Sequence, residues 1–545
     1  MKITLAQLNY HIGNFEGNLQ KMLGAVEQAK LEGSDLICFG EMATCGYPPR
    51  DFLEFKDFIL HSMESVQKLA DAAQGIAIAV GSPSVNPVIQ GKDLYNSAFF
   101  LFDGKIQHIS HKALLPTYDI FDEYRYFEPA KEFSTVTYKG YKIAITICED
   151  IWNVGNDNPL YTICPMDEMM HEKPDLMLNL SASPFSFDHA ADRILTVKAN
   201  VERYKLPIFY VNHVGAQTEI LFDGGSLVAS PDGNIYDEMP YFKECINTYD
   251  LAEVLKGAIN NEQPKEKFEL IHDGIVTGIK NYFDKLGFKK AILGLSGGID
   301  SALTAVLAVR ALGKENVRGV LMPSEYSTGH SVTDAKDLAE NLGIQYDIVP
   351  IKAIFDGYEN LLQPLFEGKP NDVTEENIQA RIRGMILMAL SNKFGNILLN
   401  TTNKSEFAVG YGTLYGDLCG GLSVLGDVYK TEVYKLVAYV NKDSLVIPQN
   451  SITKPPSAEL RPGQKDSDSL PEYDILDPIL YQYIENRQGP QELIAMGFDE
   501  ALVKRILRMV NINEFKRHQS APVIRVSNKA FGVGRRLPIV GKYLS

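Results

Sequence analysis

Short apolar runs and longer amphipathic stretches alternate along the first 250 residues of the chain. The apolar runs, each bounded by polar or turn residues, predict buried strands. They cover residues 1–8, 36–39, 76–80, 97–102, 142–148 and 176–180. The stretches 19–32 and 193–204 have helical composition and lie between these strands. Strands and helices in alternation predict a layered α/β domain over residues 1–250.

A polar stretch at residues 251–269 interrupts this alternation. It is rich in charge and contains Pro264, so it predicts a linker. From residue 270 the alternation resumes, with strands expected at 291–295, 344–350 and 396–399. Residues 270–545 therefore predict a second α/β domain. Within it, residues 452–474 combine prolines with acidic residues and predict a long surface loop, a kind of segment that often serves as a lid.

Length, charge and cysteine content narrow the class of protein. The 545 residues exceed one typical core and allow two to four domains at about 150 residues each. The net charge of −16 argues against nonspecific binding of nucleic acid or anionic membrane. The six cysteines are scattered, which argues against a zinc site and a disulfide framework. No apolar run approaches the roughly 18 residues that span a bilayer, and we expect a cytoplasmic protein.

The hexapeptide Ser296-Gly297-Gly298-Ile299-Asp300-Ser301 lies where the strand at 291–295 should turn into a helix. Its glycines let the backbone approach a polyanion, and the first amides of the helix point at it. Asp300 can hold a magnesium ion that bridges phosphates. The Lys-Ser/Thr ending of a Walker A loop is missing. The hexapeptide resembles instead the pyrophosphate-binding loop of the N-type ATP pyrophosphatases, which split ATP into AMP and pyrophosphate; an ordinary glycine-rich turn is the alternative.

Three polar residues at predicted strand ends form a second candidate site. Cys148 ends the strand at 142–148, Glu41 follows the strand at 36–39, and Lys112 follows a further apolar segment. A nearby ammonium favours the thiolate, which is the nucleophile. A carboxylate can take the thiol proton, and the lysine can hold the oxyanion of an attacked amide. Taken singly, each residue has a plain structural alternative, as a buried thiol or a surface charge.

Residues 1 to about 250 resemble the nitrilase, or carbon–nitrogen hydrolase, family, which has an αββα sandwich fold. The resemblance rests on Gly40-Glu41, on the stretch from Lys112 to Pro116 with the downstream 121–127, and on Cys148-Glu149-Asp150-Ile151-Trp152. It implies the catalytic residues Glu41 as general base, Lys112 as oxyanion lysine, Cys148 as nucleophile and Glu123 as a supporting glutamate. It further implies that glutamine is bound by Tyr118, Ser183, His189 and Arg193, with His189 near the place where we expect a lysine.

Residues 270–545 resemble the NAD synthetases, in which ATP transfers an adenylate to the carboxylate of deamido-NAD and ammonia then displaces AMP. The resemblance rests on the phosphate loop, on Thr401-Thr402-Asn403-Lys404-Ser405-Glu406, on Lys430-Thr431 and on residues 455–460. It implies a Rossmann-like parallel-sheet domain of the ATP pyrophosphatase type. The implied ATP-binding residues are Gly294, Leu295, Ser296, Gly297, Gly298, Ile299, Asp300, Ser301, Met322, Thr401 and Lys430. Those implied for deamido-NAD are Asn377, Arg381, Glu406 and Lys516, with Asp300 and Glu406 as ligands of Mg²⁺.

The whole chain thus resembles the glutamine-dependent NAD synthetases, since an activated carboxylate needs ammonia and an amidase in the same chain can release it. The resemblance implies ATP, glutamine and deamido-NAD as substrates, Mg²⁺ as cofactor, and a homo-oligomer built from dimers, up to an octamer. Three alternatives remain. They are a glutamine-dependent ligase for another acceptor, a tRNA-modifying adenylase, and an amidohydrolase whose C-terminal half only senses ATP.

Overall fold

The computed structural model describes residues 1–158, 160–257, 260–262 and 266–544 of the chain. By its internal contacts the chain divides into two compact units, Met1–Lys265 and Glu266–Ser545. Each unit has its own sheets and its own buried core. In the described part of the chain, no helix has the length and apolar character needed to cross a membrane.

The first unit contains two six-stranded sheets. One has the order β14-β1-β2-β3-β4-β5 and the other β13-β12-β9-β8-β7-β6. The strands of the first sheet are β1 (Lys2–Gln7), β2 (Leu36–Cys38), β3 (Ala77–Val85), β4 (Leu94–Phe102), β5 (Lys105–His111) and β14 (Cys245–Asp250). Those of the second are β6 (Val136–Tyr138), β7 (Tyr141–Ile147), β8 (Leu176–Leu180), β9 (Ile208–Val211), β12 (Leu227–Ala229) and β13 (Ile235–Glu238). A separate hairpin pairs β10 (Val214–Gln217) with β11 (Ile220–Asp223).

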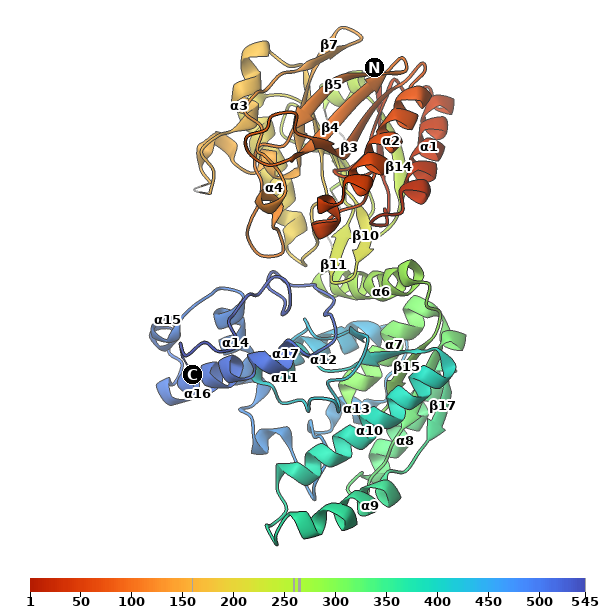
Figure 1. Ribbon diagram of the computed structural model, residues 1–545, viewed down its shortest axis with the longest axis vertical. Helices are drawn as coiled ribbons and strands as arrows, with labels where there is room; N and C mark the ends of the chain where they lie inside the picture. Colours follow the sequence, from red (N-terminus) through yellow and green to blue (C-terminus); the bar gives the residue numbers. More distant parts are fainter. Residues whose placement is uncertain (159, 258–259, 263–265, 545) are drawn as a thin grey trace. The chain divides into compact units, whose positions relative to one another are not determined.

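The two sheets face each other across one apolar core. Alternate residues of β1, such as Ile3 and Leu5, pack in the same cluster as Ile145 of β7 and Leu178 of β8. The other faces are covered by helices: α1 (Phe15–Leu31) and α2 (Lys56–Ala72) on the first sheet, α3 (Pro165–Met169) and α4 (His189–Tyr204) on the second. The predicted αββα sandwich is therefore confirmed (Figure 1).

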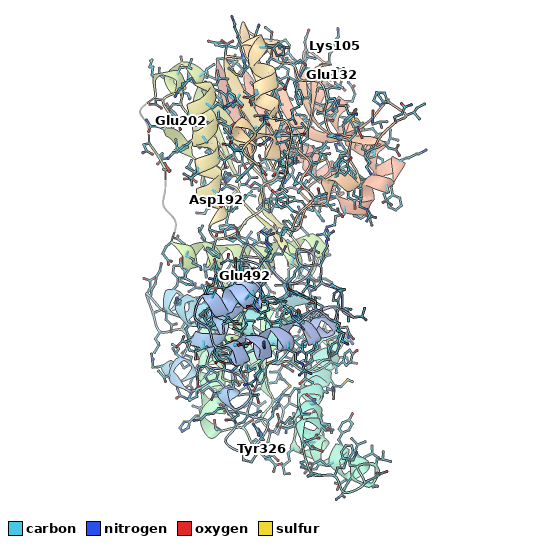
Figure 2. The ribbon with its side chains drawn as sticks, turned by 90° about the vertical axis from the view of Figure 1, so that its left-hand side faces the viewer. Lys105, Glu132, Asp192, Glu202, Tyr326 and Glu492 are labelled. Atoms are coloured by element: carbon cyan, nitrogen blue, oxygen red, sulfur yellow. The ribbon has the colours of Figure 1, made fainter. Side chains whose placement is uncertain are left out.

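Helix α4 shows how the sequence fixes these outer layers. Val197 and Val201, one turn apart, are buried against the second sheet, whereas Asp192 and Glu202 are exposed and extend from the helix (Figure 2). The apolar stripe is continuous from its first turn, because Ala190 is buried as well. The helix accordingly starts at His189, four residues before the predicted start at residue 193.

The stretch expected to be a linker, residues 251–269, is partly helical. Helix α5 (Leu251–Lys256) follows β14 directly, and its Leu251 and Val254 are buried in the core between the sheets. Helix α6 (Lys267–Leu286) begins within the same stretch. Glu253 and Lys256 are exposed on α5, while Pro264 lies outside the described residues.

The second unit is built on a five-stranded sheet in which every pair of neighbours is parallel, with the order β17-β16-β15-β18-β19. The strands are β15 (Ala291–Gly294), β16 (Val317–Leu321), β17 (Gln345–Ile348), β18 (Ile397–Asn400) and β19 (Leu422–Ser423). Their connections contain α7 (Ile299–Leu312), α8 (Gly329–Leu342), α9 (Lys352–Leu362), α10 (Val373–Phe394) and α11 (Lys404–Val409). The order in which successive strands are added to the sheet reverses between β15 and β18, the place where such sheets bind ligands. The predicted Rossmann-like domain is confirmed.

A helical layer that the sequence did not predict completes this unit. It contains α12 (Lys430–Val440), α13 (Gln449–Thr453), α14 (Tyr473–Ile484), α15 (Pro490–Ala495), α16 (Glu500–Ile512) and α17 (Glu514–Arg517). Apolar residues of α11, α14, α15 and α16 form a core separate from that of the sheet. The proline-containing stretch 452–474 remains largely irregular between α13 and α14, in agreement with the predicted loop.

Candidate functional site

Glu41, Lys112 and Cys148 meet at the ends of strands from both sheets of the first unit. Glu41 follows β2 and Lys112 follows β5, whereas Cys148 follows β7 in the opposite sheet. The site is therefore assembled from both sheets, with Glu41 and Lys112 from one and Cys148 from the other. Cys148 has a φ of 43°, a left-handed conformation that a non-glycine residue adopts only when its surroundings impose it. The turn lifts the thiol out of the strand and toward the other two side chains.

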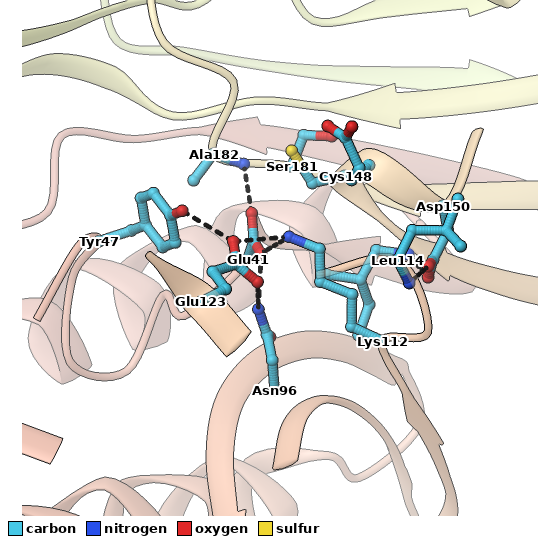
Figure 3. A network of polar contacts seen from close by, with 12 residues as sticks. Glu41, Tyr47, Asn96, Lys112, Leu114, Glu123, Cys148, Asp150, Ser181 and Ala182 are labelled. Atoms are coloured by element: carbon cyan, nitrogen blue, oxygen red, sulfur yellow. Dashed lines mark hydrogen bonds and ion pairs between the residues drawn. The ribbon is translucent and has the colours of Figure 1, made fainter. Parts of the chain in front are cut away.

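The ammonium of Lys112 lies between two buried carboxylates (Figure 3). Its Nζ is 2.7 Å from Oε1 of Glu41 and 2.8 Å from Oε1 of Glu123. Opposite charges this close, in a buried site, raise the pKa of Lys112 well above its usual range despite the burial. Burial and the Glu41 charge raise the pKa of Glu123, against the opposing effect of Lys112. Lys112 is consequently a fixed positive charge.

Further donors fix the two carboxylates in place. Asn96 Nδ2 donates to Glu41 Oε1 at 2.6 Å, and the Ala182 amide donates to Glu41 Oε2 at 3.1 Å. Tyr47 donates its hydroxyl to Glu123 Oε1 at 2.7 Å. Asn96 and Tyr47 were not predicted, because the sequence shows no pattern that separates them from ordinary core residues.

The Cys148 thiol lies beside this network (Figure 3). Its pKa is raised well above the usual range by burial and by the Glu41 charge, and Lys112 acts in the opposite direction. The thiol is thus neutral until a base accepts its proton. Asp150, in the same turn, accepts hydrogen bonds from the backbone amides of Ile147, Ala113 and Leu114 at 3.0, 3.0 and 2.9 Å. This carboxylate ties the Cys148 turn to the segment that follows Lys112.

The four residues expected to bind glutamine differ in accessibility. Tyr118 is 41% exposed and donates to Glu149 at 2.9 Å. Ser183 Oγ lies 3.0 Å from Nε2 of His189, whose ring stacks on Trp152. Arg193 is completely buried, and a bidentate ion pair at 3.0 and 2.8 Å joins it to Asp223. Arg193 is therefore positioned to hold the protein together at this site. Ser183 is buried as well, whereas Tyr118 is exposed and His189 is half-buried.

The second unit holds a cavity of about 600 Å³ at the carboxyl ends of β15 and β18. Most of the residues expected to bind ATP and deamido-NAD line it. These are Gly294, Leu295, Ser296, Gly298, Ile299, Asp300, Ser301, Met322, Thr401 and Lys430 for ATP, and Asn377, Glu406 and Lys516 for deamido-NAD. The structure thus brings together residues that are separated by more than two hundred positions in the sequence.

Gly297 of the phosphate loop packs against α8 and does not line the cavity. Its φ is 76°, and a Cβ placed there would lie 2.2 Å from the carbonyl oxygen of Ser331. Only glycine fits both the conformation and the contact. Hydrogen bonds within the loop, from Gly298 N to Ser296 Oγ at 3.2 Å and from Ser301 Oγ to Gly298 O at 3.0 Å, hold it in this shape.

One lysine faces several carboxylates at the bottom of the cavity. Lys430, at the first position of α12, forms ion pairs with Asp300 and, at 3.5 Å, with Glu406. A further carboxylate, Asp466 of the stretch 452–474, lies close enough to raise the pKa values of Lys430 and Glu406. Burial and these acidic neighbours raise the pKa of Glu406 to about 8, although Lys430 opposes the shift. The negative charge exceeds the positive charge here, which favours an added cation.

Helix α10 turns Arg383 toward the cavity, whereas Arg381 was the arginine expected to bind deamido-NAD. Arg381 is exposed and donates to the Leu414 carbonyl at 3.3 Å, and its charge contributes to lowering the pKa of Lys516. Arg383 lines the cavity and donates to the Met322 carbonyl at 3.0 Å. Asn377, whose amide oxygen accepts from Thr413 at 2.8 Å, is on the cavity side as predicted. The motif contains both arginines, and only the helix packing decides between them.

The stretch 452–474 lies along the cavity and is attached to two helices. Glu459 accepts from Ser331 of α8 at 2.6 Å, and Lys454 donates to the same hydroxyl at 2.9 Å. Gln379 of α10 donates to the Leu460 carbonyl at 2.9 Å. Residues 454–460 of this stretch line the cavity. These contacts attach the stretch to α8 and α10 beside the cavity.

Comparison with known proteins covers both units. The family model described as carbon–nitrogen hydrolase matches residues 2–258, and the one described as NAD synthase matches residues 271–520. The glutamine-dependent NAD(+) synthetase of Synechocystis is 46% identical over 98% of both chains. The enzyme of the same name from Thermotoga maritima is 40% identical over 100% of this chain and 99% of its own.

The chain belongs to the glutamine-dependent NAD⁺ synthetases. A solved structure of the Acinetobacter baumannii enzyme, in complex with adenosine diphosphate, covers 99% of both chains at 39% identity with a TM-score of 0.79. Members of this family join a nitrilase-like glutaminase to an NAD synthase in one chain. The protein accordingly carries out ATP-dependent amidation that forms NAD⁺ with glutamine as the nitrogen donor.

Proposed function

We propose that the network around Lys112 is the site of glutamine hydrolysis and that Cys148 is its nucleophile. Glu41 takes the thiol proton as Cys148 attacks the glutamine amide, and Lys112 stabilises the oxyanion with the backbone amide after Cys148. Glu123 holds Lys112 in place. Glu41 gives the thiol proton to the amide nitrogen, so that ammonia leaves and the acyl group remains on the Cys148 sulfur as a thioester. The carboxylate is then free to take a proton from the water that attacks the thioester, which releases glutamate and the Cys148 thiol. The observation that supports these roles is the buried contact of one ammonium with two carboxylates beside a neutral thiol.

For the synthetase step we propose that ATP and deamido-NAD occupy the cavity of the second unit. The phosphate loop and Lys430 bind the phosphates, while Met322 and Thr401 lie along the nucleotide. Asn377, Lys516 and Arg383 are placed for deamido-NAD, with Arg381 at the edge. Adenylation of the nicotinate carboxylate releases pyrophosphate, and displacement by ammonia releases AMP. The covering stretch 452–474 excludes the water that would hydrolyse the adenylate.

Mg²⁺ fits the carboxylates at the bottom of this cavity. Asp300 and Glu406 would hold it, and the ion would neutralise charge on the ATP phosphates. Among the described residues, no group of three or more His, Cys, Asp or Glu side chains is arranged to bind a metal by itself. Mg²⁺ commonly takes one or two carboxylates and completes its coordination with substrate phosphates and water. The acidic cluster therefore fits an ion that arrives with ATP.

We also propose that the protein is cytoplasmic and that it forms a homo-oligomer built from dimers, up to an octamer. Helix α9 supports self-association, because Ile354, Tyr358 and Leu361 are exposed at a helical repeat. On α10, Met385 is 70% exposed. The six cysteines are free thiols, which fits a reducing compartment.

The division of roles is tested with Cys148→Ala. We expect this variant to lose synthesis supported by glutamine and to keep synthesis supported by ammonium chloride, because the substituted thiol acts before ammonia exists. Both rates are measured as NAD⁺ formed with ATP, Mg²⁺ and deamido-NAD. Retained activity with glutamine would remove Cys148 from the mechanism. Detection of AMP and pyrophosphate, in place of ADP and phosphate, checks the adenylation step in the same assay.

A further inference from the structure

Asp477 is a buried carboxylate of the second unit to which the chemistry proposed above gives no role. It belongs to α14, is 4% exposed, and is not among the described residues that line the cavity. Its Oδ2 accepts the backbone amide of Thr431 at 2.9 Å and the Thr431 hydroxyl at 2.8 Å. Its Oδ1 accepts the hydroxyl of Ser405 at 2.5 Å. Both oxygens are therefore bound to the first turns of two other helices, α12 and α11.

Helix α12 needs these contacts because the residue before it supplies no cap. Among the described residues of this turn, Tyr429 at the N-cap makes no side-chain hydrogen bond to the helix. The first amide, that of Lys430, donates instead to Ser405 Oγ at 2.9 Å, and the second, that of Thr431, donates to Asp477. Buried amides at a helix start are costly when they have no acceptor. Side chains of α11 and α14 thus provide the cap that the sequence of α12 lacks.

The residue held by this cap is Lys430, whose ammonium faces the carboxylates of the cavity. Lys430 is the first residue of α12 and is paired with Asp300 and Glu406. Its Nζ also lies 5.5 Å from the centre of the Tyr473 ring. Tyr473 and Asp477 are four residues apart on α14 and so share one face of that helix. This face supports the lysine at two points, the start of its helix and its ammonium.

The carboxylates of the cavity have a support of their own. Asn403 donates from Nδ2 to Asp300 Oδ1 at 3.1 Å, and its Oδ1 accepts the backbone amide of Glu406 at 3.0 Å. Asn403 is the N-cap of α11 and lies at the opposite side of the ion pairs from the start of α12. Loss of the Asp477 carboxylate should therefore act mainly on Lys430.

We propose that Asp477 is a positioning residue for the synthetase reaction, which fixes Lys430 where the phosphates of ATP bind. Asp477 acts through the backbone of α12, since its contacts are with Thr431 and Ser405. A charged group stabilises a transferring phosphoryl or adenylyl group only when it is held in place before the reaction. The proposal rests on the proposed role of Lys430 in binding these phosphates.

The test measures synthesis with ammonium chloride, so that the rate does not depend on the glutaminase site. NAD⁺ formed by the full chain is followed with ATP and Mg²⁺ over a range of deamido-NAD concentrations. We expect Asp477→Ala to lower kcat about 10²-fold, because a misplacement of about 1 Å costs roughly that much. KM for deamido-NAD should change by less than about threefold, since Lys430 is placed for ATP. Asp477→Asn keeps one acceptor oxygen and should lose only about tenfold.

Lys430→Met separates positioning from general damage to the unit. A residue that acts only through Lys430 has nothing left to position once the lysine is gone. Asp477→Ala should therefore lower synthesis by less than about twofold when it is added to Lys430→Met. A purely structural loss would be the same in both backgrounds, because independent effects add in free energy. Asp477→Asn takes the place of Asp477→Ala in this comparison if the alanine variant does not fold.

Two control variants are matched to Asp477. Asp474→Ala changes an exposed aspartate on the same helix. Glu266→Ala removes the cap of α6, where Glu266 accepts the Glu269 amide at 3.1 Å; residues 267–286 of that helix, all described, do not line the cavity. Both variants should keep synthesis within about twofold of the unsubstituted rate. Thermal unfolding midpoints of all variants show which of them are folded at the assay temperature.

Synthesis by Asp477→Ala within about twofold of the unsubstituted rate would overturn the proposal. An equal loss with and without Lys430 would also overturn it and make Asp477 a structural residue. Failure of the proposed ATP site is distinguished, because Lys430→Met alone would then form NAD⁺ at the unsubstituted rate.

Discussion

Charge at single residues determines when each site is ready to react. In the first unit, Lys112 is held between Glu41 and Glu123, so its positive charge is fixed before glutamine arrives. In the second unit acidic side chains outnumber basic ones, since Lys430 faces Asp300, Glu406 and the nearby Asp466. The first site is preorganised for a developing oxyanion. The second site requires an added cation before it can bind a polyphosphate favourably.

The raised pKa of Glu406 predicts a pH-dependent stability in the absence of ligands. The folded protein holds this proton up to about pH 8, whereas the unfolded chain releases it near its ordinary value. The folded state binds more protons between these limits, so stability is lost as the pH rises through that window. Glu406→Gln removes this titration and should gain stability relative to the unsubstituted protein, by up to about 1.4 kcal/mol for each pH unit.

Thermal unfolding midpoints between pH 5 and pH 8 measure this difference. The matched control is Glu492→Gln, an exposed glutamate of the same unit (Figure 2), which should follow the unsubstituted protein at every pH. A difference between Glu406→Gln and the unsubstituted protein that stayed constant with pH would show that Glu406 is ionised throughout. Mg²⁺ with ATP should reduce the difference, because the carboxylate then gains a cation.

At the scale of elements, the phosphate loop depends on its contact with the first turn of α8. Gly297→Ala places a Cβ 2.2 Å from the Ser331 carbonyl and forces a side chain into a φ of 76°. We expect a cost of about 1–3 kcal/mol in stability. The loop must shift to relieve the clash, and a shift of about 1 Å should lower synthesis roughly 10²-fold. The loss should be the same with glutamine and with ammonium.

Gly329→Ala is the control for this prediction. It adds the same methyl group to the first residue of α8, where no atom lies within 4 Å of the new Cβ. Synthesis rates with ammonium and unfolding midpoints are compared for both variants. Normal synthesis by Gly297→Ala would show that the loop does not need its contact with α8.

Local sequence patterns predicted the strands well and the helical layer poorly, for a physical reason. A strand such as β8 (Leu176–Leu180) is buried on both faces and is therefore apolar apart from Asn179. The helices α14, α15 and α16 bury only one side each, against one another and against α11, which lies much earlier in the chain. The phosphate loop and the Cys148 turn were predictable because their chemistry is local. Arg383 and Asp466 were not, because helix rotation and loop path bring them into the cavity.

At the scale of the whole molecule, the protein carries out two reactions, and the ammonia released by the first is consumed by the second. Ammonia in water at neutral pH is mostly ammonium, which has no free electron pair for attack on the adenylate. Each unit is compact and has its own core, so neither depends on the other for its internal packing. A chain that merely joined two independent enzymes would lose nitrogen to solvent.

We therefore expect glutamine hydrolysis to rise several-fold when ATP, Mg²⁺ and deamido-NAD are present, with close to one glutamate released for each NAD⁺ formed. Both products are measured in the same reaction, with and without the synthetase substrates. Asp300→Ala is the control, because it should abolish synthesis from either nitrogen source and leave the substrate-free rate of glutamine hydrolysis unchanged. A large excess of glutamate over NAD⁺ would show two uncoupled activities.

The neutral state of the Cys148 thiol bears on how the protein withstands oxidants. Peroxides and alkylating reagents react with thiolates and spare thiols. Because burial and Glu41 keep the resting Cys148 protonated, such reagents find little thiolate to attack until an amide is bound and the proton moves. The proposed nucleophile is thereby protected by the same burial that would make it depend on Glu41. Irreversible inhibitors of this site are accordingly expected to be molecules that imitate glutamine, and general thiol reagents are expected to act slowly.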